Sequence, residues 1–177
     1  MKNQKVRFIT ETALFLALLV AVQYITSSMG QFVTGSAVNL ILIASCTISG
    51  TWSGLIVALV SPFVARIFGI GPALIQIVPA IAAGNAILVL SYACIGKIKI
   101  KFEYVKWVIS IAAGALLKYI VLSVSVSRVI LPLTNVPGQM AAKLTAMFGV
   151  NQLITAVIGG ILAMIVVPLV KRGIERK

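Results

Sequence analysis

Apolar runs long enough to cross a bilayer constrain this chain more than any other feature of its sequence. They recur along most of its 177 residues. A helix needs about 20 residues to cross the hydrocarbon core, since each residue advances it by about 1.5 Å. Hydrophobic residues make up 60% of the chain and charged residues 10%. A water-soluble domain of this size could not shield so much apolar surface, so the sequence predicts an integral membrane protein lying in the lipid bilayer.

We predict an all-α fold, a compact bundle of six transmembrane helices that forms a single domain over residues 1–177. The second and third spans are short, and Gly50 with "TWSG" between them favours a hairpin. The predicted spans are residues 10–28, 36–50, 53–70, 72–96, 105–127 and 146–170.

The charges of this chain predict its orientation. The net charge of +12 comes from 15 Lys and Arg against three acids. The basic residues gather at the start of the chain, in "KIKIKFEYVK" and in "KRGIERK", and six helices bring all three places to one face. The positive-inside rule then predicts that both termini are cytoplasmic. A basic patch for RNA or anionic lipid is the alternative; we favour the topological interpretation and expect no nucleic-acid partner.

The residue types that are missing exclude most enzyme chemistry. The chain has no His, and its acids are Glu11, Glu103 and Glu175. A His-dependent triad, a His-rich metal site and a carboxylate pair are therefore excluded. We expect no metal, no cofactor and no enzyme activity. Cys46 and Cys94 lack CxxC spacing, and we expect both to be small buried hydrophobes.

The first apolar run could be misread as a secretory signal peptide. It continues to Tyr24, however, and no A-x-A cleavage site follows it. We therefore interpret it as a transmembrane helix. Glu11 is expected at the N-terminus of this helix, where the helix dipole favours an anion, with Thr10 or Thr12 as its cap.

Polar residues from several predicted spans reach the outer half of the membrane. Lys118 lies 13 residues into the fifth span, about 20 Å from the inner edge of a core about 30 Å thick. Because polar groups are costly in hydrocarbon, this convergence predicts a small-molecule pocket open to the outside. The simpler alternative is that each amide bonds a neighbouring helix. The candidate substrate-binding residues are Lys118, Gln76, Asn151, Asn39, Asn85, Gln152, Tyr24, Gln23 and Arg66.

Two further features near this layer remain open. Asn85 lies deeper, on a helix that Pro79 can bend and Gly84 can bring close to a neighbour, and it fits either a pocket floor or an interhelical bond. The segment "RVILPLTNVPGQMAAK" is expected outside the membrane, either covering the pocket or as an inert connector.

A pocket open to the outside suggests uptake, yet the chain shows no energy source. It has no GxxxxGK[ST] motif and no intramembrane proton relay. The protein therefore either equilibrates its ligand passively or takes energy from another subunit. Ala13, Ala17 and Ala21 form a small-residue stripe that would let a helix of another subunit approach closely, although internal packing explains it equally well.

Together these features resemble the substrate-binding S component of energy-coupling factor (ECF) vitamin transporters. "GSAVNLILIASCTISG", "IGPALIQIVPAIAAGNAILV" and "FGVNQLITAVIGGILA" are similar to segments of that family. The resemblance implies that Ala13, Ala17 and Ala21 contact the membrane-embedded T component. It also implies that two ATPase subunits drive import, and that the chain binds a vitamin or related micronutrient from outside. No tryptophan-rich loop is present, which disfavours thiamine.

We therefore predict the substrate-specific subunit of an ECF importer in the prokaryotic plasma membrane. Lys118, with Arg66 or Arg128 at similar depth, favours an anionic ligand. The main alternative is a stand-alone facilitator or channel, which would need polar residues through both leaflets. A membrane enzyme would have only Lys118 as a nucleophile, and a purely structural subunit would leave Lys118 unexplained.

Overall fold

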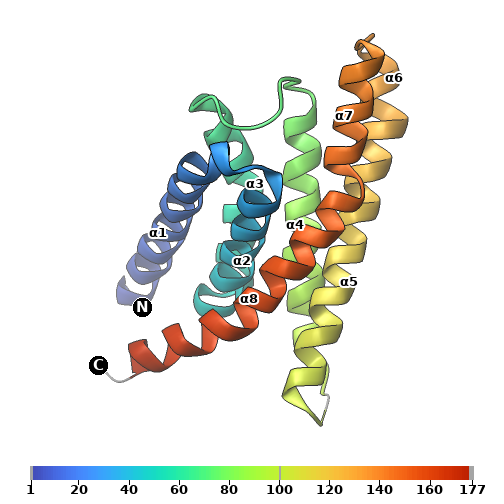
Figure 1. The fold of residues 1–177 in the computed structure, drawn as a ribbon. Helices are drawn as coiled ribbons and strands as arrows, with labels where there is room; N and C mark the ends of the chain where they lie inside the picture. Colours follow the sequence, from blue (N-terminus) through green and yellow to red (C-terminus); the bar gives the residue numbers. More distant parts are fainter. Residues whose placement is uncertain (1, 100, 176–177) are drawn as a thin grey trace.

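The computed structural model describes residues 2–99 and 101–175, and helices make up nearly all of them (Figure 1). Within this described part there is no strand. The elements in chain order are α1 (Lys2–Thr26), the 3-10 turn η1 (Ser27–Met29), α2 (Gln31–Ser49), α3 (Thr51–Ile67), α4 (Ile77–Gly96), α5 (Glu103–Val124), the π-helical segment η2 (Ser125–Ile130), α6 (Leu131–Leu133), α7 (Gly138–Phe148) and α8 (Val150–Glu175).

The all-α bundle expected from the sequence is confirmed. Five helical stretches in the described residues are long and apolar enough to cross a membrane, and α3 is a shorter apolar helix of 17 residues. Gly50, with a φ of 93°, forms the tight α2–α3 connection. This left-handed conformation suits glycine, which explains why the second and third spans form a hairpin.

The segment between the fifth and sixth spans differs from its prediction. The expected external loop over residues 128–143 is mostly helical, because η2 and α6 continue α5, and α7 leads into α8. Only residues 134–137 connect the two stretches. Pro132 is the second residue of α6 and directly follows the π-helical segment η2, so the backbone changes from α to π geometry before the proline and the helix continues through it.

The start of α1 also corrects a prediction. The helix begins at Lys2, so Glu11 lies more than two turns inside it rather than at its N-terminus. Arg7 Nε, one turn earlier, pairs with Glu11 Oε1 at 2.6 Å. Thr12 does not cap the helix; its hydroxyl donates to the Phe8 carbonyl at 2.7 Å and contacts Ser53 Oγ at 2.9 Å. The charge of Glu11 is thus compensated by a side chain and not by the helix dipole.

Both ends of the described chain lie at the same end of the bundle as the α4–α5 connection, at the bottom of Figure 1. The three basic segments therefore share one end, which we call the basic end. Of these segments, Ile100, Arg176 and Lys177 lie outside the described residues. That the basic end faces the cytoplasm stays a prediction.

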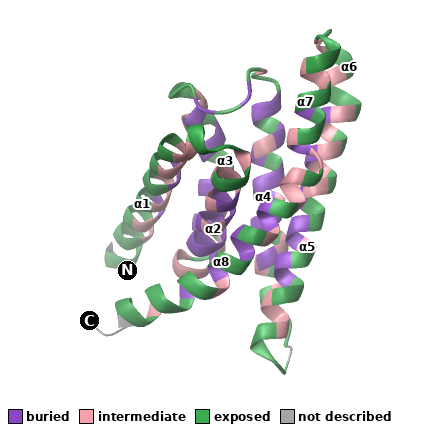
Figure 2. Ribbon diagram, in the orientation of Figure 1, coloured by how far each residue is buried: buried purple, intermediate pink, exposed green. Residues whose placement is uncertain are grey.

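The most buried helices are α2 and α4, and α1 is the most exposed long helix (Figure 2). Gly159 of α8 allows a close approach to the α2 backbone: a Cβ there would lie 2.5 Å from the Ser36 carbonyl oxygen and 2.6 Å from Asn39 Cβ. Gly84 brings α4 against Leu122 of α5 in the same way, as the sequence suggested. Small residues thus set the spacing of the helices that carry the polar groups.

The two cysteines differ in exposure. Cys46 is buried in the α2 core, as expected, whereas Cys94 is exposed on the last turn of α4. The prediction for Cys94 was wrong because an apolar helix facing lipid has the same composition as one facing the core.

Candidate functional site

Lys118 is the centre of the candidate site. It lies on α5, about 22 Å along the helix from Glu103, and only 2% of it is exposed. Its Nζ donates to Asn39 Oδ1 of α2 at 2.6 Å and to Asn85 Oδ1 of α4 at 2.7 Å. Both asparagines are buried as well. Three helices are therefore joined by one buried lysine.

The two amides do not neutralise Lys118. An ammonium group has three N–H donors, and the described residues provide acceptors for two of them. Glu11 and Glu103 both lie toward the basic end, in α1 and at the start of α5, so neither accompanies Lys118. A buried cation without a counter-charge is costly, which makes an acceptor supplied by a ligand favourable.

A cavity of about 240 Å³ opens next to Lys118. It lies in the half of the bundle away from the basic end, among η1, the start of α2, the α3–α4 loop and the α7–α8 junction. The lining residues are Gln23, Ser27, Gln31, Thr34, Gly35, Val38, Ile70, Gly71, Pro72, Ile81, Asn85, Lys118, Met147, Phe148 and Gln152. This volume lies just below the range of about 300–1,000 Å³ that is usual for pockets of drug-sized ligands, so the cavity suits a small molecule.

Several polar groups at or near this cavity have unused hydrogen-bonding capacity. Gln23 Oε1 and Asn39 Nδ2 are buried, and neither has a hydrogen-bond partner in the described part of the chain. Gln31 and Gln152 each donate from Nε2 to the Met147 carbonyl, Gln152 at 3.3 Å. These two glutamines connect α2 and α8 to the end of α7, which therefore closes one side of the cavity.

The structure brings together about half of the residues proposed from the sequence. Gln23, Asn85, Lys118 and Gln152 line the cavity, and Asn39 lies behind them as a partner of Lys118. The remaining candidates do not line it. Gln76 is exposed before α4, Asn151 is half-buried in the first turn of α8, Arg66 is half-buried in the last turn of α3, and Tyr24 is exposed on α1.

Sequence reasoning missed the remaining lining residues. Gln31 and Thr34 precede the predicted start of the second span, but α2 begins at Gln31, so both face the cavity from its first turn. Gly30 directly precedes α2 and has a φ of 88°, so this glycine was the feature of the sequence that could have indicated where the helix starts. The sixth span predicted from the sequence begins at residue 146 and so includes Met147 and Phe148 as membrane-spanning residues. None of the lining residues comes from 128–143, all of which are described, so that segment does not cover this cavity.

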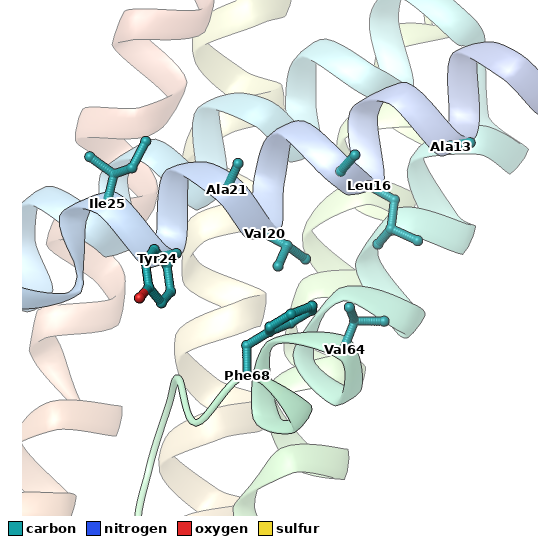
Figure 3. Close-up of a pocket in the computed structure, with 9 residues that line it drawn as sticks. Ala13, Leu16, Val20, Ala21, Tyr24, Ile25, Val64 and Phe68 are labelled. Carbon is teal, nitrogen blue, oxygen red and sulfur yellow. The ribbon is translucent and has the colours of Figure 1, made fainter.

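A second, apolar hollow of about 840 Å³ lies between α1 and α3, and we call it the α1–α3 groove (Figure 3). Val20 and Leu16 of α1 and Val64 and Phe68 at the end of α3 face one another across it. The alanine stripe lies along its α1 side, and all three alanines are exposed. The stripe is therefore not used for packing within the described chain.

These features define a class of protein: a multi-pass helical membrane protein with a small polar cavity around a buried lysine and an open apolar groove on its first helix. The chain matches the family model described as "ECF transporter, substrate-specific component" over residues 7–171. It belongs to that family. It is therefore a cell-membrane protein and a substrate-specific subunit of an ECF transporter, a kind of subunit that is not itself an ATPase.

The family implies a T component and ATPase subunits as partners. Searches of curated proteins and of solved structures find no match to this chain. The ligand must therefore be argued from the site itself.

Proposed function

We propose that this chain captures a small anionic solute, a vitamin or related micronutrient with a carboxylate or phosphate group, in the cavity next to Lys118. The single observation that carries the proposal is the buried Lys118, which is held by two amide oxygens and has no carboxylate partner among the described residues. A ligand anion would supply both the missing acceptor and the missing charge.

The remaining polar groups of the cavity would recognise the uncharged part of the ligand. Gln23 Oε1 has no partner in the described residues and would accept from a ligand N–H or O–H. The cavity of about 240 Å³ limits the ligand to a small molecule. Ile81, Val38 and Phe148 line it with apolar surface, which suits a ligand with a hydrophobic portion.

We further propose that the ligand enters from outside and that the T component docks on the α1–α3 groove. The cavity lies away from the basic end, which the positive-inside rule assigns to the cytoplasm. The exposed alanines would let a partner helix approach α1 closely. ATP hydrolysis by two ATPase subunits would then supply the energy that this chain lacks.

Lys118→Met tests the ligand class, because methionine retains the length of the side chain and removes its charge. Charge-assisted hydrogen bonds contribute about 1.5–3 kcal/mol, so we expect at least about a tenfold loss of affinity. The ligand is first identified by mass spectrometry of the small molecules that co-purify with the full chain, and its affinity is then measured by calorimetry.

Lys143→Met is the matched control, since Lys143 is exposed on α7 and lies outside the cavity lining. It should bind as the wild type does. Equal affinity of the Lys118 variant and the wild type for an identified ligand would remove Lys118 from the site.

The alternative of a stand-alone facilitator is opposed by the layer beneath the cavity. Leu42 and Ile43 follow Asn39 along α2, Leu88 and Val89 follow Asn85 along α4, and all four are 0% exposed. This apolar layer separates the cavity from the basic end. Solute flux through the purified chain in liposomes without ATPase partners would favour the facilitator instead.

A further inference from the structure

A second polar cavity lies at the basic end of the bundle and has no part in the proposed function. Its volume is about 300 Å³, and five helices and the residue after α4 line it. Three lysines from separate elements reach it: Lys97 directly after α4, Lys106 in the first turns of α5 and Lys171 near the end of α8. Positions far apart in the sequence thus bring three cations to one cavity.

The charges around this cavity are unbalanced. Among the described lining residues Glu103 is the one acid, and its Oε1 lies 3.3 Å from Lys106 Nζ. The structure describes no ion pair for Lys97 or Lys171. Three cations against one carboxylate favour an anion in the cavity, and the hydroxyls of Thr47 and Tyr92 in its wall add hydrogen-bonding groups.

An apolar groove continues from this cavity along the outside of α5 and α8. It measures about 360 Å³ and includes Met164, Val167 and Pro168. Trp107, Glu103 and Lys171 line both spaces, so the cavity and the groove adjoin one another. Trp107 packs edge-on against Tyr92, with ring centroids 5.6 Å apart, and so stands at the junction of the two spaces.

We propose that this combined site binds an anionic phospholipid, with its phosphate headgroup among Lys97, Lys106 and Lys171 and an acyl chain in the groove beyond Trp107. The three lysines lie at helix ends, where the interface between hydrocarbon and headgroups is expected. Free phosphate would satisfy the lysines but would leave the groove unused. The position of an apolar groove directly beside the polar cavity therefore favours the lipid.

Quenching of Trp107 fluorescence by brominated lipid tests the site in the intact chain. Trp52 is the other tryptophan, so Trp52→Phe leaves Trp107 as the one reporter. The protein is reconstituted in phosphatidylcholine vesicles with increasing fractions of phosphatidylglycerol or phosphatidylcholine that carries bromine on its acyl chains. We expect brominated phosphatidylglycerol to quench Trp107 at lower mole fraction than brominated phosphatidylcholine. Equal quenching by the two lipids would overturn the proposal without any lysine variant.

Lysine substitutions then test the headgroup contact. Each lysine near a charged membrane surface contributes about fivefold to the binding of an anionic lipid, so Lys97→Gln, Lys106→Gln and Lys171→Gln should each lower the preference for phosphatidylglycerol about that much. The matched control for each is a single variant at a lysine outside the cavity, Lys5→Gln, Lys99→Gln or Lys101→Gln, which removes one charge from the same end. Its preference should change little. An equal loss in the control would show a diffuse surface effect and contradict a specific site.

Inorganic phosphate distinguishes the two sources of the anion. Millimolar phosphate, compared with chloride at equal ionic strength, should not displace brominated phosphatidylglycerol, because only the lipid fills the groove. Displacement by phosphate would show that the cavity takes the free anion and would overturn the lipid proposal.

Discussion

At the scale of single residues, the cost of burying polar groups identified residues of the site from the sequence, but the sequence did not predict which of them pair with one another. Lys118, Asn39 and Asn85 each stood out in the sequence because polar groups are rare in hydrocarbon. That the lysine donates to both asparagines depends on the rotation of three helices about their axes, which residue spacing along one chain does not specify. Gln76 and Asn151 show the converse, since neither lines the cavity: Gln76 is exposed directly before α4, and Asn151 is half-buried in the first turn of α8.

The Lys118–Asn39 contact predicts a measurable coupling between the two residues. Asn39→Leu keeps the approximate volume but removes one acceptor from a buried cation, so we expect it to lower the free energy of unfolding by about 1–3 kcal/mol. Combining it with Lys118→Met removes both partners, and the loss should then be smaller than the sum of the single losses. Denaturant unfolding in detergent, followed by circular dichroism, measures all three variants.

Asn151→Leu is the control for this cycle, because the structure describes no side-chain hydrogen bond for Asn151. It should change the free energy of unfolding little and should be additive with Lys118→Met. Additive losses for Asn39→Leu and Lys118→Met would contradict the contact.

At the scale of helices, the existence of each span was predictable and its limits were not. A helix lies at each of the six predicted spans, and five of the helical stretches in the described residues are long and apolar enough to cross a membrane, because the bilayer imposes a minimum apolar length. The polar first turns of α1 and α2 were left out because hydropathy falls where a helix leaves the hydrocarbon, although the hydrogen bonding of the helix continues. The loop expected over 128–143 was wrong because Pro132 follows the π-helical segment η2 within a continuous helical stretch and Pro137 directly precedes α7, so neither proline breaks a helix.

The α1–α3 groove predicts the effect of enlarging one alanine. Ala17→Leu places a bulky side chain on the exposed stripe, and overpacking of this kind costs about 1–3 kcal/mol, so the association constant for the T component should fall about tenfold. Binding of the solute should be unchanged, because Ala17 does not line the cavity next to Lys118. Quantitative pull-down of the T component and the ATPase subunits measures the effect.

Ala112→Leu serves as the control, since Ala112 is exposed on α5 and lies outside the groove. It should retain the partners at wild-type levels. Undiminished recovery of the T component with Ala17→Leu would place the docking surface elsewhere.

At the scale of the whole molecule, the arrangement of charge predicts the orientation of the protein in the membrane. The basic segments meet at one end of the bundle although they lie at the start, middle and end of the chain (Figure 1). We therefore expect that a thiol on α7 is accessible from outside the cell and a thiol on the α4–α5 connection is not.

Labelling of single cysteines checks this orientation. In a Cys46→Ala, Cys94→Ala background, Gln139→Cys should react with a membrane-impermeant maleimide in intact cells. Lys99→Cys should react only after permeabilisation. Both side chains are exposed, so access depends on the side of the membrane and not on burial. The reverse pattern would show that the protein has the opposite orientation, with the cavity facing the cytoplasm.

The α1–α3 groove has a thermodynamic consequence for assembly. The groove measures about 840 Å³ and has an almost wholly apolar lining, so we expect acyl chains to fill it before a partner arrives. Docking there would exchange lipid for protein and would remove little apolar surface from water. Since the heat-capacity change of association reports apolar surface taken from water, it should be small for a contact made at this groove. Lipids that bind α1 would then compete with the T component for the groove, so assembly of the transporter would depend on the lipid composition of the membrane.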